Sequence, residues 1–444
     1  MRQKKHILLA LLIVSINSTT TLLAQNNKLV LSNHEKQITI DSICNKLMKI
    51  YVFPDVAINM AKSIQENFTS GNYESINNPD DFADELSKDL YFISQDKHIR
   101  VDYNPEEIAY YNQKITAEDS LNNLNQYIDN LKRENFGFKE VKILNGNIGY
   151  LDLRSFSNVD YAKSTAVAAM NFLSNSDAII VDLRMNGGGM PSMIQLISSY
   201  LFSENPVHLN NFYWRQMDST TQSWTLPEVD GIRSPTTPVY ILTSNRTFSA
   251  AEEFSYNLKN LNRAILIGET TGGGAHPGSI VTATDNFTVW IPSGRAINPI
   301  TNTNWEGTGV TPHVKTTSQE ALGIAHIAAL ETLLENCEET QLKHFYEWNL
   351  IGLKATVNPI TLDIKCIESH AGVYGSIKIS VAGNKLLYQK NSNLEYELIP
   401  INKNEFMLQG NNSFRIKFIV EDGETIELEV QYENGRSDRK LKTI

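Results

Sequence analysis

Ser249 has the sequence context of a catalytic nucleophile. The segment PVYILTSNRTFSAAEEF (residues 238–254) predicts a buried strand ending at Thr243, a short loop, and a helix that starts at Ser249. A hydroxyl at a helix N-terminus lies at the positive end of the helix dipole. The N–H of Ala250 would point toward negative charge that develops on a substrate oxygen. This arrangement suits acyl transfer.

The same residues also have a purely structural interpretation. Ser249 and Glu252 have the spacing of a capping box, in which the serine caps the helix and the glutamate reaches back to the serine backbone. Taken alone, this tetrapeptide is more typical of a cap than of a catalytic site. A second feature is needed to favour chemistry.

Two glycine runs provide that second feature. The first, in VDLRMNGGGM (residues 181–190), follows a predicted buried strand, and the second is GGGAHPG (residues 272–278). In open α/β sheets ligands bind at the carboxyl ends of strands, where glycine backbone offers unshielded N–H groups. Neither run is followed by the Lys-Ser/Thr of a phosphate loop, which disfavours nucleotide binding. A tight strand-to-helix turn remains the alternative for the first run.

A serine nucleophile needs a base, and the sequence favours histidine over lysine. No lysine lies between Lys259 and Lys315, which is the segment after the predicted nucleophile helix. The histidines within the predicted folded core are His98, His208, His276, His313 and His326. Of these, His98 precedes a strand-like segment and His276 lies in the second glycine run, so these two are the best placed.

The elements that position these residues fall into three parts of unequal type. At roughly 150 residues per domain, 444 residues suggest about three domains. Residues 25–110 predict a small helical lobe, and residues 104–135 are polar and read as a connection. Residues 111–340 predict an α/β core with mainly parallel strands, from the alternation of buried strands and helices. Residues 350–444 show short β-rich runs without a helix signature, and predict a small antiparallel barrel or sandwich.

The N-terminus and the charge exclude some functions. Residues 1–24 combine a basic start, a ten-residue apolar run at 7–16 and an alanine at position 24, which predicts a signal peptide rather than a membrane span. The whole chain has a net charge of −11. Removing three basic residues leaves 36 − 50 = −14. Such an acidic chain is a poor nucleic-acid binder. The expected protein is secreted or periplasmic, with no membrane span once the signal is removed.

Four motifs in order carry a family resemblance. DLRMNGGG (residues 182–189), TFSAAEEF (247–254), GETTGGG (268–274) and NWEGTGVTP (304–312) resemble the tail-specific, or C-terminal processing, serine proteases. One branch of that family uses a Ser–Lys dyad, but Gly273 occupies the lysine position here. The other branch is similar to the tricorn protease core and to the repeats of interphotoreceptor retinoid-binding protein, and uses Ser, His and Glu.

The resemblance to this second branch implies the site. It places the nucleophile at Ser249, the base at His98 and the carboxylate at Glu306, with oxyanion donors at the amides of Gly189 and Ala250. Glu306 would support the base directly or through another polar group. The tricorn pattern has a serine directly before the histidine, where this sequence has Lys97. Ser94 or another hydroxyl is the candidate for that place.

The resemblance also implies a ClpP/crotonase-like α/β core and a peptide or protein substrate, with no cofactor and no metal. Dyad-type members insert a PDZ domain between lobe and core, but residues 104–140 are too few for a domain of roughly 90 residues. The expected activity is that of an exported serine-type endopeptidase working through an acyl-enzyme. The alternative is a non-catalytic binding protein for apolar ligands or peptides on the same fold. The sequence leaves the oligomeric state open.

Overall fold

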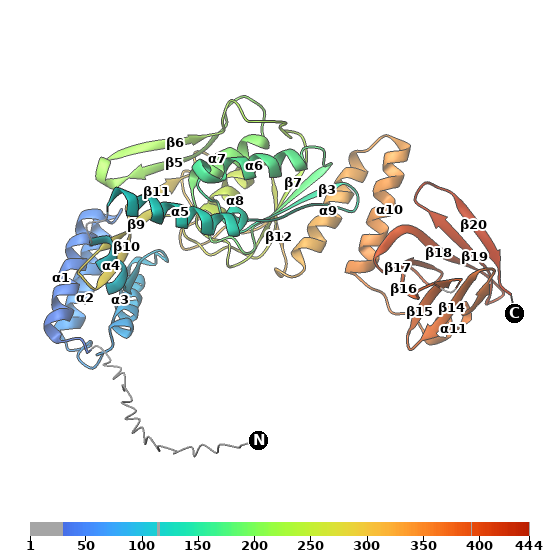
Figure 1. Cartoon of the computed structure of the whole chain (residues 1–444), viewed down its shortest axis with the longest axis horizontal. Coiled ribbons are helices and arrows are strands. Elements are labelled where there is room, and N and C mark those ends of the chain that lie inside the picture. The colour runs from blue at the N-terminus through green and yellow to red at the C-terminus, as the bar shows by residue number, and fades with distance from the viewer. Residues whose placement is uncertain (1–29, 113–115, 392, 444) are drawn as a thin grey trace, which may run out of the picture.

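The computed structural model describes residues 30–112, 116–391 and 393–443, and arranges them as three parts in a row (Figure 1). A helical lobe lies at one end, an α/β core in the middle and a β-barrel at the other end. The predicted signal peptide lies outside the described residues. Within the described ranges, no helix combines the length and apolar character needed to cross a membrane.

The helical lobe is built from two distant segments of the chain. Its helices are α1 (Asn33–Ile50), α2 (Pro54–Thr69) and α3 (Pro79–Ser94), followed by strand β1 (Arg100–Tyr103). β1 pairs with β10 (Phe287–Pro292), which in turn pairs with β9 (Gly278–Thr282). Side chains of β10 lie in one apolar cluster with the three helices. Because β9 and β10 follow the second glycine run, this hairpin ties the end of α3 to that run.

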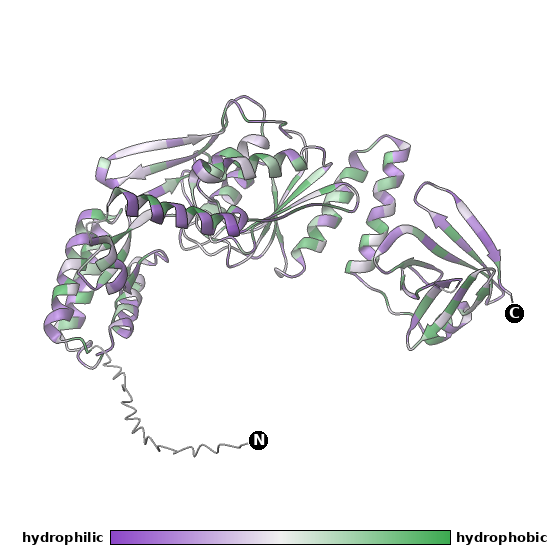
Figure 2. Cartoon of the chain, in the orientation of Figure 1, coloured by the Kyte–Doolittle hydropathy of each residue, from purple (hydrophilic) through white to green (hydrophobic). Residues whose placement is uncertain are grey.

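The polar segment expected as a connection contains two helices, α4 (Pro105–Asn112) and α5 (Ala117–Arg133). No residue of α5 is buried, and much of the helix is purple in Figure 2. Thr116 and Asp119 form a capping box that stabilises the N-terminus of α5. The helix also has a stripe of apolar side chains at helical spacing, which is exposed or half-buried: Leu121, Leu124, Ile128 and Leu131.

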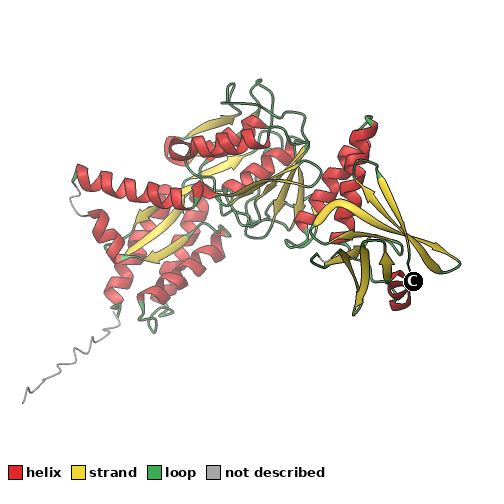
Figure 3. Ribbon diagram, turned by 45° about the vertical axis from the view of Figure 1, so that its right-hand side comes forward, coloured by secondary structure: helices red, strands yellow, loops and turns green. Residues whose placement is uncertain are grey.

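The core is a six-stranded sheet in the order β12-β8-β7-β4-β3-β2, parallel except for β2. Helices cover both faces (Figure 3): α6, α7 and α8 share one apolar cluster, and α9 shares the other. This confirms the predicted α/β class, and the double cover explains why the strands are continuous apolar runs. The elements are β2 (Phe138–Leu144), β3 (Ile148–Leu153), α6 (Val159–Leu173), β4 (Ala178–Asp182), α7 (Pro191–Tyr200), β7 (Val239–Thr243), α8 (Ala250–Asn260), β8 (Ile265–Gly268), β12 (Val314–Lys315) and α9 (Ala321–Asn336).

A separate three-stranded ribbon extends from the core above the helical lobe (Figure 1). It has the order β11-β5-β6, all antiparallel. Its strands are β5 (His208–Trp214), β6 (Ser219–Trp224) and β11 (Gly294–Ile297). Short 3₁₀ turns at Asn135–Gly137 and Arg215–Met217 complete the connections. Since β11 follows β10 directly in the chain, the ribbon and the helical lobe are joined next to the second glycine run.

The C-terminal part is a nearly closed antiparallel barrel of eight strands, as the β-rich pattern predicted. An isolated bridge between Val373 and Thr443 brings its two ends together. The prediction of no helix after residue 350 was wrong: α10 (Thr340–Val357) runs past it and α11 (Ile364–His370) precedes the barrel. The barrel strands are β13 (Gly372–Tyr374), β14 (Ile377–Ala382), β15 (Lys385–Lys390), β16 (Tyr396–Pro400), β17 (Glu405–Leu408), β18 (Asn411–Glu421), β19 (Glu424–Tyr432) and β20 (Ser437–Leu441).

Candidate active site

Ser249 lies at the sharp turn between β7 and α8. Its backbone has φ 55° and ψ −120°, an uncommon conformation for a residue with a side chain. Strained turns of this kind place a nucleophile at the carboxyl edge of a sheet, at the start of a helix. Ala250 is the first residue of α8, so its amide has no acceptor within the helix. The local structure therefore has more strain than a helix cap requires.

Glu252 does more than cap the helix. One of its carboxylate oxygens accepts from the Ser249 amide (2.9 Å), which is the glutamate half of the predicted capping box. The carboxylate also accepts from the amides of Gly273 (2.6 Å) and Gly274 (2.8 Å) and from the hydroxyl of Thr271. Burial raises the pKa of Glu252, although these hydrogen bonds oppose the rise. Glu252 thus fastens the second glycine run to the serine turn.

The first glycine run crosses directly over Ser249. A Cβ on Gly188 would lie 2.8 Å from the Ser249 Cβ, and the φ of Gly188 is 112°. The next residue, Gly189, bridges to Phe156, and a Cβ there would lie 2.3 Å from the Phe156 carbonyl oxygen. Only glycine fits at these two positions, and the run reaches the serine because of it.

His98 enters the site from the helical lobe, between α3 and β1. Its ring packs against Phe248, the residue directly before Ser249, with centroids 4.7 Å apart. A Cβ on Gly274 would lie 2.7 Å from the His98 Cε1 atom. The side chain is 10% exposed. The structure therefore brings the predicted base, from a different lobe, beside the predicted nucleophile turn.

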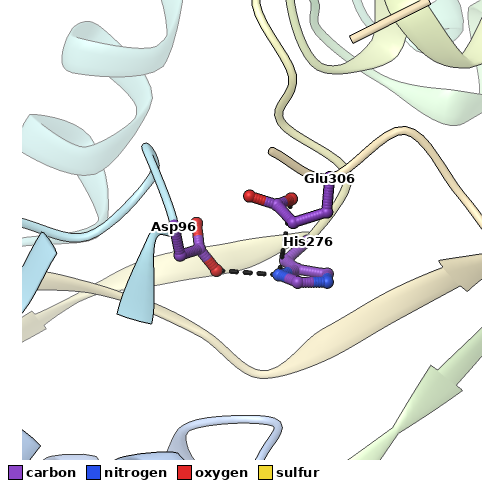
Figure 4. A group of neighbouring side chains, drawn as sticks. All are labelled: Asp96, His276 and Glu306. Carbon is purple, nitrogen blue, oxygen red and sulfur yellow. Dashed lines mark hydrogen bonds and ion pairs between the residues drawn. The ribbon is translucent and has the colours of Figure 1, made fainter. Parts of the chain in front are cut away.

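The carboxylate nearest the His98 ring belongs to Asp96. Its Oδ1 atom lies 3.5 Å from His98 Nδ1 and accepts the His98 backbone N–H at 3.0 Å. Its Oδ2 atom lies 2.8 Å from His276 Nδ1 (Figure 4). Burial alone would favour neutral Asp96, but hydrogen bonds from His276 and His98 outweigh it and hold its pKa well below the ordinary range.

Glu306 contacts His276 rather than His98. Its Oε2 atom lies 3.4 Å from His276 Nδ1 and accepts the Ala275 amide at 2.5 Å. Burial, and then repulsion by Asp96, raises the pKa of Glu306 to about 8. Trp305 beside it donates its indole N–H to the Gly274 carbonyl (2.7 Å), which holds the Glu306 loop against the glycine run.

The remaining histidine candidates have structural contacts. The His208 ring stacks on Trp224, His313 accepts the Leu266 amide at 2.9 Å, and His326 lies 2.7 Å from the Asn145 carbonyl oxygen. Sequence reasoning did not single out Asp96. The available signal was its place two residues before His98, a spacing at which an aspartate side chain can accept the backbone N–H of the second residue after it.

Asp96, His276 and Glu306 are also of types that bind divalent metal ions, with ligand atoms all within 4.8 Å of one another. Each group already has a hydrogen-bond partner, including the Ala275 amide on Glu306 and the His98 amide on Asp96. Within the cluster, His276 hydrogen-bonds Asp96 and lies at ion-pair distance from Glu306.

Comparison with known proteins defines the class. Residues 147–316 match the model of peptidase family S41, and residues 21–134 match the N-terminal domain of Peptidase_S41 in eukaryotic IRBP. The two matches together span most of the chain and correspond to the core and the helical lobe. The chain therefore belongs to peptidase family S41, a family of serine peptidases, as the motif resemblance predicted.

Individual relatives are more distant. The carboxyl-terminal-processing peptidase 1 of Arabidopsis thaliana, a chloroplastic protein, is 27% identical over 180 residues, covering 39% of this chain. The match spans only about a third of that relative, 35% of its length. A Streptococcus agalactiae lipoprotein has a TM-score of 0.44 and 13% identity, over 67% of this chain and 96% of the other. The tricorn protease has a TM-score of 0.42 and 14% identity, over 68% and 37%.

Proposed function

We propose that this protein is an exported serine-type endopeptidase of the tail-specific kind, with Ser249 as nucleophile and His98 as base. The supporting observation is the convergence of two lobes: His98 packs against Phe248, directly before the strained Ser249 turn. Glu306 is the glutamate of the Ser-His-Glu pattern. It acts on His98 through His276 and Asp96 rather than by direct contact. The amides of Gly189 and Ala250 are the proposed oxyanion donors.

The proposed reaction follows general acid–base logic. His98 takes the proton of the Ser249 hydroxyl as the serine oxygen bonds to the peptide carbonyl carbon. The oxygen of that carbonyl gains negative charge, which the two backbone amides stabilise. His98 then gives the proton to the leaving amine, and the acyl-enzyme forms. Water, deprotonated by His98, cleaves the ester and restores Ser249.

Export rests on residues 1–24, whose composition is that of a signal peptide. The acidic mature chain fits a protein that acts on peptides rather than nucleic acid. N-terminal sequencing of the mature protein from its native host should start at Gln25. A mature protein that still begins at Met1 would contradict export by this signal.

The test of the activity is direct. Purified wild type should hydrolyse peptides and be labelled by a fluorophosphonate, and Ser249→Ala should lose labelling and at least about 10³-fold of its activity. The capping serine Ser32, at the start of α1, provides a matched control, since Ser32→Ala leaves labelling intact. Equal hydrolysis by wild type and Ser249→Ala would reject the mechanism. If neither is labelled and neither hydrolyses peptide, while peptide still binds, the non-catalytic alternative is favoured.

A further inference from the structure

The cluster of side chains behind His98 contains a carboxylate, Asp96, that the Ser-His-Glu pattern does not assign. We propose that Asp96 is the positioning residue that orients His98 and balances its positive charge, and that His276 links Asp96 to Glu306. This inference rests on the proposed function and adds to it. Asp96 takes the role that the tricorn pattern gives to the serine before the histidine, for which the sequence had suggested Ser94.

The first argument is geometric. Asp96 is fully buried, and its Oδ1 atom accepts the His98 backbone N–H and faces the ring Nδ1 of His98 at 3.5 Å. When Nδ1 faces a carboxylate, the other ring nitrogen, Nε2, is left to serve the nucleophile. The 3.5 Å separation is longer than an ordinary hydrogen bond. Such contacts often tighten only when substrate is bound.

Asp96 is itself held from three sides. Ser94 accepts its backbone N–H at 3.1 Å, His276 lies at 2.8 Å from Oδ2, and the Tyr51 hydroxyl lies at 3.4 Å from the same oxygen. His276 is 5% exposed and packs edge-on against Phe53, with centroids 5.2 Å apart. A carboxylate with this many fixed partners keeps one orientation, which is what a positioning residue requires.

The second argument is electrostatic. Asp96 and Glu306 both face the imidazole of His276, but their environments push their pKa values apart. The pKa of Asp96 lies well below the ordinary range, and that of Glu306 is raised to about 8. These opposite shifts favour the negative charge on Asp96 over Glu306. Pairs of acids separated in this way have different roles in a reaction.

The charged and titratable groups around Asp96 come from five parts of the chain. Tyr51 follows α1, and Lys97 and His98 lie between α3 and β1. His276 belongs to the second glycine run, Glu306 to the loop after β11, and Glu252 to α8. Lys97 donates to the Gly272 carbonyl at 2.5 Å and lies on the outer, exposed side. Within the described part of the chain, Asp96 and Glu306 are the acids in contact with the two histidines.

The experiment measures the rate of fluorophosphonate labelling of Ser249 between pH 5 and 9. In this reaction the serine oxygen bonds to phosphorus, fluoride leaves, and His98 receives the serine proton. Asp96→Asn should lower the maximal rate by about 10³- to 10⁴-fold, as expected when the carboxylate behind a catalytic histidine is replaced by an amide. It should also shift the midpoint of the pH profile downward, because the protonated imidazole loses its counter-charge. A purely structural role would lower the labelled fraction without moving the midpoint.

Glu306→Gln keeps the proposal testable even if Asp96→Asn does not fold. Since its raised pKa favours a neutral Glu306, glutamine should cost no more than about tenfold in rate, and the midpoint should stay in place. The matched control is Glu429→Gln, a buried glutamate paired with Arg439 in the barrel, which should label at the wild-type rate per folded molecule.

Two results would overturn the inference. One is an Asp96→Asn protein that labels with the wild-type rate and midpoint. The other is a Glu306→Gln protein as inert as Ser249→Ala, which would place the charge on Glu306. Both results require wild type to be labelled at Ser249. They are therefore distinct from failure of the proposed function, in which wild type is not labelled at all.

Discussion

At the residue scale, Gly188 shows how closely the backbone approaches the proposed nucleophile, Ser249. A methyl group there would meet the Ser249 Cβ at 2.8 Å, and its φ of 112° is strained for any other residue. Gly188→Ala should therefore displace the run or the serine. We expect labelling and hydrolysis to fall by about 10²-fold or more, since small displacements of reacting groups have effects of that size.

Gly187 provides the matched control for this prediction. It lies next in the same run, but nothing lies within 4 Å of a Cβ built on it. Gly187→Ala should keep its activity within about twofold of wild type, with similar thermal stability. Equal losses in both variants would mean that flexibility of the run, rather than the approach at Gly188, limits activity.

At the element scale, α8 carries a buried acid that the proposed chemistry does not use. Glu253 is 3% exposed, and burial raises its pKa to about 8. The folded protein therefore holds this proton up to about pH 8, whereas the unfolded chain releases it from about pH 4.5. The folded state binds more protons in this interval, so the free energy of unfolding falls as pH rises from 5 to 8. Glu306 acts in the same direction.

Glu253→Gln should reduce this dependence. An amide keeps the shape of the protonated acid but cannot ionise, so the slope of stability against pH should flatten by up to about 1.4 kcal/mol per pH unit. In urea unfolding, the variant should have a higher free energy of unfolding than wild type at pH 8. At pH 5 the two proteins should have similar values. An unchanged slope would show that Glu253 ionises freely in the folded protein.

The elements themselves were largely predictable, and the site was predictable in part. Buried strands such as Val239–Thr243 are continuous apolar runs, so sequence shows them directly. Helix α5 lies in a segment whose polar composition indicated a connection, although Leu124, Ile128 and Leu131 recur in it at helical spacing. Asp96 acquires its proposed role only when the β1–β10 pairing brings the helical lobe to the second glycine run, a contact between residues far apart in sequence. Local patterns identify candidates for chemistry, but long-range pairing decides which acid meets which histidine.

At the scale of the whole molecule, α10 joins the core to the barrel. Tyr346 and Leu350 on this helix pack in the apolar cluster with α9. Trp348, also on α10, donates its indole N–H to the Asn412 carbonyl (2.7 Å) in β18. The guanidinium of Arg415, from the same strand, lies 3.8 Å from the centre of the Trp348 ring. One face of α10 therefore packs against the core and the other against the barrel. Because both parts share this helix, we expect the core and the barrel to unfold in a single transition.

Trp348→Ala should uncouple the two parts. Loss of a buried tryptophan costs about 3–5 kcal/mol, and here it also removes the cation–π contact and leaves the buried Arg415 without its partner surface. We expect calorimetry to show an earlier, separate barrel transition, while Ser249 labelling below that transition keeps the wild-type rate. Lys343→Ala, at an exposed position of the same helix, should leave a single transition. If Trp348→Ala instead slows labelling while both parts stay folded, the barrel must influence the site through α10 and α9, and the barrel would then be a regulatory element of the peptidase.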